Sequence, residues 1–168
     1  MKTALLSRDD ILSALDEVMD PEVPVLSVVE LGIVRDIVIE DEGITVVITP
    51  TYSGCPAMRV IEEDILAALA ARGVARARIQ TVYAPAWTTD WLSDASRRKL
   101  EAYGIAPPGM VSNDPVVSIT RRSTAPRSCC PFCHSLDTEV RSEFGSTACK
   151  SICYCRACEQ PFEMFKAF

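Results

Sequence analysis

Four cysteines near the C-terminal end have the spacing of a metal site. Cys130 and Cys133 form one CxxC pair, Cys155 and Cys158 form a second, and 21 residues separate the pairs. Two residues between thiols turn both sulfurs toward one ion, so two such knuckles complete a tetrahedral set of ligands. Four thiolates leave no open coordination position, which predicts a structural zinc ion. Iron, which paired knuckles also bind, is the alternative.

Three further cysteines and the only histidine lie in the same stretch: Cys129, Cys149, Cys153 and His134. Cys129 is too close to Cys130 to join the same tetrahedron comfortably. Cys153 lies two residues before Cys155, on the same face of a strand, and His134 could serve in an alternative ligand set. We expect each of the four to be a buried or surface residue without a ligand role.

The remaining cysteine, Cys55, stands alone between Gly54 and Pro56, where a strand ends and a helix begins. A thiol at or near a helix N-cap faces unpaired N–H groups and the positive end of the helix dipole, and both favour the reactive thiolate. Gly54 lets the backbone bend, and Thr51 is a candidate lining residue. The alternative is a small residue buried in a tight turn. A cluster needs about four ligands, so one at Cys55 would need a second subunit, as in a homodimer, a partner protein or an added thiol.

Other polar and aromatic residues could line a site shared with Cys55. Trp87, Thr89 and Asp90 follow the end of a predicted strand, and Asp20 and Glu22 could supply carboxylates. Each also has a structural explanation. Thr89 or Asp90 could cap a helix, the tryptophans could belong to the core, and a proline-bounded turn at residues 20–24 would account for the two carboxylates.

The elements that position Cys55 form an α+β domain. Ser7 and Asp10 predict a capped helix start, and residues 33–39 and 44–49 predict a β-hairpin. A second helix is expected from Pro56 to Gly73, then a strand at 76–84 and a helix from about Asp90 to Gly104. This order predicts a small mixed three-stranded sheet with helices packed on it.

The C-terminal cysteines belong to a second, smaller domain. Residues 139–142, 151–154 and 162–165 read as the strands of a zinc-ribbon β-hairpin domain. About forty residues cannot bury a sufficient core, so the ion would supply much of the folding free energy. Residues 106–128 contain stretches typical of a linker at 107–109, 113–115 and 121–128, with a short strand expected at 116–119. The expected domains are therefore 1–105, a linker at 106–128, and 129–168.

Composition and charge exclude several classes of protein. Hydrophobic residues make up 48% and charged residues 24% of the chain, as in an ordinary globular protein, and no apolar run approaches the ~18–20 residues of a membrane span. The short apolar N-terminus favours a cytoplasmic protein, whose reducing surroundings suit metal-bound thiols. Residues 1–120 hold 18 acidic and 10 basic side chains, which argues against nucleic acid as a partner.

These segments resemble a known family. Residues 20–24, 31–34 and 49–56 are similar to the hallmarks of the iron–sulfur cluster assembly (SufT-like) domain. A second set of segments is similar to the D subunits of phenylacetyl-CoA epoxidase (PaaD, also called PaaJ). This set comprises residues 85–91 and 105–108, the ribbon with residues 144–150, and the aromatic stretch 161–166. The resemblance covers nearly the whole chain, and His134 after the first knuckle is its one visible departure.

The resemblance implies a role in aerobic phenylacetate degradation, where a multicomponent oxygenase epoxidises the ring of phenylacetyl-CoA. It implies a non-catalytic accessory subunit that helps to assemble or repair an iron or iron–sulfur centre, with Cys55 as a transient ligand. The partners would be the iron–sulfur flavin reductase or the di-iron oxygenase subunit. The residues agree with a non-catalytic role, because the chain has one histidine and no Glu-x-x-His motif and so lacks the ligands of a di-iron site. Two alternatives remain: a zinc-ribbon scaffold or docking protein without metal transfer, and a thiol redox protein.

Overall fold

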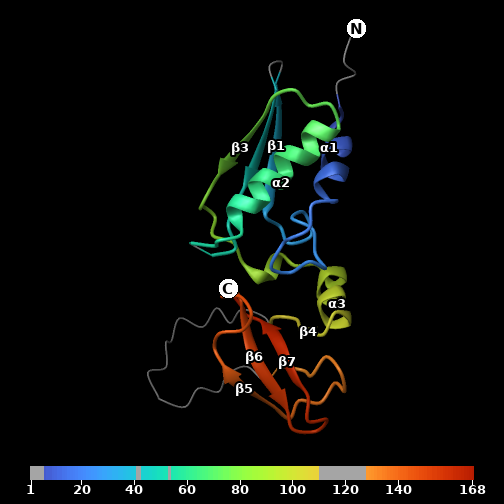
Figure 1. Ribbon diagram of the computed structural model, residues 1–168, viewed down its shortest axis with the longest axis vertical. Coiled ribbons are helices and arrows are strands. Elements are labelled where there is room, and N and C mark those ends of the chain that lie inside the picture. The colour runs from blue at the N-terminus through green and yellow to red at the C-terminus, as the bar shows by residue number, and fades with distance from the viewer. Residues whose placement is uncertain (1–5, 41–42, 53, 110–127) are drawn as a thin grey trace. The chain divides into compact units, whose positions relative to one another are not determined.

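The structure is a computed structural model that describes residues 6–40, 43–52, 54–109 and 128–168. The chain divides into two compact units, Met1–Trp87 and Thr88–Phe168 (Figure 1). Most of the expected linker, and with it the short strand expected at 116–119, lies outside the described residues.

The first unit is the mixed sheet with helices that the sequence predicts. Its elements are α1 (Arg8–Leu15), β1 (Val34–Glu40), β2 (Gly43–Ile48), α2 (Met58–Ala71) and β3 (Ala77–Thr81). The sheet order is β1-β2-β3, with β1 antiparallel and β3 parallel to β2. Helix α2 lies across the sheet beside α1 (Figure 1). Burial of its apolar stripe, Ile61, Ile65 and Leu69, holds it there.

Local signals set the ends of these helices, with one shift. The Ser7–Asp10 capping box is present at α1, and Gly73, at φ 83°, follows the end of α2 as predicted. Helix α2 begins at Met58 rather than Pro56, and its cap residue Ala57 offers no side-chain acceptor. Cys55 therefore lies in the turn before the helix and not at its N-cap.

The second unit contains the ribbon. Its sheet has the order β4-β7-β6-β5, formed by β4 (Ile105–Ala106), β5 (Thr138–Ser142), β6 (Lys150–Cys155) and β7 (Pro161–Phe165). Strands β5, β6 and β7 form an antiparallel meander at the expected positions. Strand β4, which the sequence does not predict, pairs in parallel with β7. The buried side chains behind this sheet include Ala106, Cys153, Phe162 and Met164.

The helix expected from Asp90 is shorter and later. A 3₁₀ turn, η1 (Thr89–Trp91), comes first, and α3 (Asp94–Ala102) follows. Ser93 accepts a hydrogen bond from the Ser96 backbone and so fixes the start of α3. The cap of η1 is Thr88, not Thr89 or Asp90.

The compact units divide earlier in the chain than composition suggests. Ile105 pairs with Glu163, and Ala106 with Met164. Helix α3 contacts β4, and both elements belong to the second unit. None of the helices in the described part of the chain has the length and apolar character needed to cross a bilayer.

Candidate metal centre and thiol site

The structure brings the sulfurs of Cys130, Cys133, Cys155 and Cys158 together. All four lie within 4.8 Å of one another. Two of the sulfur pairs, Cys130–Cys158 and Cys133–Cys155, are 3.7 and 3.5 Å apart. Four Zn–S bonds of about 2.3 Å at tetrahedral angles place the sulfurs about 3.8 Å apart, so the cluster fits zinc. No other His, Cys, Asp or Glu cluster of this kind occurs among the described residues.

Backbone groups and burial act in opposite directions on these thiols. Hydrogen bonds from the backbone of Cys158 and also of Ala157 help lower the pKa of Cys155 to about 7, against the effect of burial. Burial, reinforced by the neighbouring sulfurs, raises the pKa of Cys158 to about 12. A divalent cation offsets the repulsion among four thiolates, so the donor set favours a bound metal.

The other three cysteines of the second unit, Cys129, Cys149 and Cys153, lie outside this cluster and contact protein groups instead. Cys153 is buried, and burial raises its pKa to about 11. Cys149 is also buried, and its sulfur lies 3.1 Å from the Thr147 hydroxyl. The Cys129 sulfur lies 3.2 Å from the His134 carbonyl oxygen. None of the three belongs to the four-sulfur cluster.

His134 also lies outside the cluster. Its Nδ1 atom is 3.1 Å from Glu101 Oε1, so its ring interacts with the end of α3. The residue adopts a positive φ of 58° directly after the first knuckle. A glycine would adopt this conformation at less cost.

Cys55 is half-buried in the turn that precedes α2. The prediction that this position favours the thiolate is wrong. Burial raises the pKa of Cys55 above its usual 9.0. A backbone hydrogen bond from Ala57 opposes this effect, and the charges of Glu22 and Asp20 add to it. The resting thiol is therefore protonated at neutral pH.

Carboxylates from the 20–24 turn lie within electrostatic range of this thiol. Asp20 is buried, and its carboxylate accepts the Glu22 and Val23 N–H groups at 2.8 and 2.7 Å. Asp20 thus shapes the turn, as expected for a residue of a proline-bounded turn, and also places negative charge near Cys55. Glu22 is half-buried.

The loop around Cys55 also contains Gly54, Thr51 and Tyr52. Gly54 has a φ of 94°, a conformation that glycine adopts readily, so the backbone can bend there. A Cβ at this position would meet no atom within 4 Å, so the space beside the backbone is open. Thr51 is buried in the same loop. The side chain of Tyr52 acts to lower the pKa of the Cys55 thiol, and its effect is smaller than that of burial, of the Ala57 backbone and of the two carboxylates. Sequence reasoning missed Tyr52, although its place three residues before the cysteine was visible.

The residues after β3 have structural partners. Trp87 is 5% exposed, and its Nε1 donates to the Leu31 carbonyl at 2.8 Å, which makes it a core residue of the first unit. Thr89 and Asp90 belong to the second unit. Thr89 is fully buried, and its backbone N–H donates to the Phe168 oxygen at 3.3 Å. Asp90 is exposed, and its N–H donates to the Thr88 hydroxyl.

Comparison with known proteins covers both halves of the chain. A family described as iron-sulfur cluster assembly protein matches residues 8–85, and the PaaD zinc beta ribbon domain matches residues 114–166. A protein of Escherichia coli (strain K12), whose name assigns it as the D component of 1,2-phenylacetyl-CoA epoxidase, is 40% identical over 94% of this chain and 91% of its own length. The chain belongs to the PaaD family.

The assembly half of this PaaD chain has wider relatives. The Fe-S protein maturation auxiliary factor YitW of Bacillus subtilis (strain 168) is 35% identical over 51% of the chain and 85% of its own length. A crystal structure of a DUF59 domain from Bacillus anthracis is 25% identical with a TM-score of 0.52. The match covers 55% of this chain and 89% of the Bacillus anthracis chain. The fold of the first unit is therefore shared beyond the PaaD family.

Proposed function

We propose that this chain is an accessory maturation subunit of a phenylacetyl-CoA epoxidase that acts in the cytoplasm during aromatic catabolism. It would help to assemble an iron or iron–sulfur centre in a partner, either the iron–sulfur flavin reductase or the di-iron oxygenase subunit. The observation that supports the proposal most is the fusion, in one PaaD chain, of an assembly-type fold carrying Cys55 with a closed four-cysteine cluster.

In this proposal Cys55 is a transient ligand for iron or a cluster, which is cargo rather than a resident cofactor. Burial and the charges of Glu22 and Asp20 keep the empty thiol protonated. An arriving cation would be attracted by the same carboxylates and would displace the thiol proton. A thiol that loses its proton only when a cation binds releases that cation readily, and ready release suits transfer to a partner.

The ribbon has a different role in this proposal. Its four sulfurs fill a tetrahedral site, so it is expected to retain zinc and to dock the partner rather than to pass metal on. The same closure supports the second candidate, a zinc-ribbon scaffold that tethers epoxidase subunits without metal transfer.

Cells that carry the complete epoxidase operon test the two candidates. Cys55→Ser should lower the cluster content of the purified reductase or the iron content of the oxygenase, together with epoxidase activity. Cys129→Ser is the matched control, because Cys129 is also a half-buried free thiol outside the zinc cluster. Normal metal content in the Cys55→Ser cells would refute the transfer role. If Cys130→Ser then abolished subunit association, the scaffold role would replace it.

A further inference from the structure

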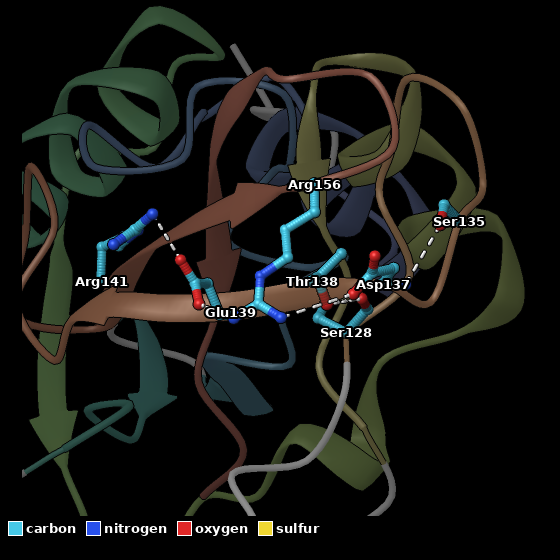
Figure 2. A network of polar contacts seen from close by, with 7 residues as sticks. All are labelled: Ser128, Ser135, Asp137, Thr138, Glu139, Arg141 and Arg156. Carbon is cyan, nitrogen blue, oxygen red and sulfur yellow. Dashed lines mark hydrogen bonds and ion pairs between the residues drawn. The ribbon is translucent and has the colours of Figure 1, made fainter.

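A polar network on the ribbon contacts both knuckles without using any of the four sulfurs. Figure 2 shows its members, Ser128, Ser135, Asp137, Thr138, Glu139, Arg141 and Arg156. Arg156 stands inside the second knuckle, between Cys155 and Cys158. The other residues lie before the first knuckle, after it, or on β5.

One path through this network runs from knuckle to knuckle. The Cys130 N–H donates to the Ser135 carbonyl at 3.0 Å. The Ser135 hydroxyl accepts the Asp137 N–H at 3.1 Å, and the Asp137 carbonyl accepts the Arg156 N–H at 2.9 Å. Three hydrogen bonds therefore connect a ligand of the first knuckle to the residue beside a ligand of the second.

A second path fixes the segment that enters the first knuckle. The Thr138 hydroxyl donates to the Ser128 carbonyl at 2.6 Å, two residues before Cys130. Thr138 is also the partner of Cys155 in the β5–β6 register. The approach to one knuckle is thus tied to the strand pair that carries the first ligand of the other.

Side chains add a third connection. The Arg156 guanidinium donates to Glu139 Oε2 and lies 3.9 Å from Asp137 Oδ1. The other oxygen of Glu139 is 2.5 Å from Arg141 Nη2. Arg141 in turn lies over the Tyr154 ring at 5.1 Å. Glu139 therefore joins the second knuckle to the face of β5 and β6.

We propose that Glu139 and Arg156 are positioning residues that hold the two knuckles in register and so slow release of the metal ion. Tetrahedral ligation requires both CxxC turns at once, and a knuckle that moves freely must be ordered again each time a ligand rebinds. Outer contacts that orient metal ligands are typically worth ~10–100-fold in affinity. Arg156 meets two carboxylates, those of Glu139 and Asp137, and such a linked set can be effective where one exposed ion pair is not.

The test is the rate at which the zinc-loaded full-length chain releases zinc to a chromophoric chelator. Arg156→Gln and Glu139→Gln should each release zinc about 10-fold faster than the wild type. Arg141→Gln is the matched control, since Arg141 binds the same carboxylate and is as exposed, 59% against 58% for Arg156, but lies outside both knuckles. It should stay within about twofold of the wild type, because its contacts, with Glu139 and the Tyr154 ring, lie outside both CxxC turns.

Two further variants separate positioning from a charge effect or a loss of fold. Thr138→Val removes only the hydroxyl that holds Ser128 and should also speed release. The double variant Arg156→Gln/Glu139→Gln should match the faster single variant, because both changes break the same contact between Arg156 and Glu139. Hydrogen exchange at the Arg156 amide should rise in each of these variants while the amides of β6 and β7 stay protected. Release from Arg156→Gln and Glu139→Gln at the Arg141→Gln rate, or multiplied effects in the double variant, would overturn the proposal.

Discussion

Replacing Glu163 by glutamine probes an ion pair buried in the ribbon. The Lys150 side chain is only 6% exposed, and its Nζ lies 3.1 Å from Glu163 Oε2. The other carboxylate oxygen accepts the Ser146 N–H at 2.6 Å. Glutamine keeps the shape and an acceptor for Ser146, so the substitution removes the charge and little else. Lys150→Met is the reciprocal change.

The two variants should not cost the same. Breaking a buried ion pair from one side costs about 3–5 kcal/mol, because the remaining charge stays buried. Glu163 is 29% exposed, and solvent screening reduces the loss for Glu163→Gln to about 2–3 kcal/mol. Lys150→Met leaves a carboxylate that reaches water and should cost about 1–2 kcal/mol. The double variant should cost about 1 kcal/mol or less, since no unpaired charge remains.

Native-state hydrogen exchange of the zinc-loaded full-length chain measures these differences. Exchange of the β6 and β7 amides reports the local free energy of unfolding of the strands that carry Lys150 and Glu163. Helices α1 and α2 in the first unit are the internal control. Strictly additive losses in the double variant, or a larger loss for Lys150→Met than for Glu163→Gln, would show that the buried charge does not control stability here.

Three further outcomes are expected. Iodoacetamide should alkylate Cys55 with a pH midpoint above 9.0, because burial raises its thiol pKa, and Glu22→Gln should move the midpoint down; a midpoint below 9.0 would contradict this. Trp87→Phe deletes the bond to the buried Leu31 carbonyl and should lower the urea-derived free energy of unfolding by about 1–3 kcal/mol, whereas an unchanged value would argue against that bond. Chelating the zinc should deprotect β5–β7 and leave the amides of β1–β3 unchanged, so uniform deprotection would contradict a separate ribbon.

Features encoded by close neighbours were predictable from the sequence. The Ser7–Asp10 capping box, the strands of the ribbon and the clustering of the two CxxC pairs were all confirmed. Each depends on residue spacing or on hydrogen bonds between residues a few positions apart, so a linear reading contains the information.

Features that depend on distant segments were not predictable. Strand β4 has two residues and no periodicity of its own, and its partner β7 lies more than fifty residues later. The raised pKa of Cys55 arises from burial and from carboxylates more than thirty residues earlier in the chain. Helix-dipole reasoning considered only the residues next to the thiol and therefore gave the opposite sign.

The pairing of β4 with β7 also decides where this protein can be cut. The two matching families span residues 8–85 and 114–166, and neither includes Ile105–Ala106. A fragment that starts at residue 114 or 128 would keep all four ligand thiols but leave β7 as an open sheet edge. Open edges recruit strands from other molecules. Such a fragment should therefore bind its metal and still self-associate, and a ribbon intended for isolation should begin at Thr88.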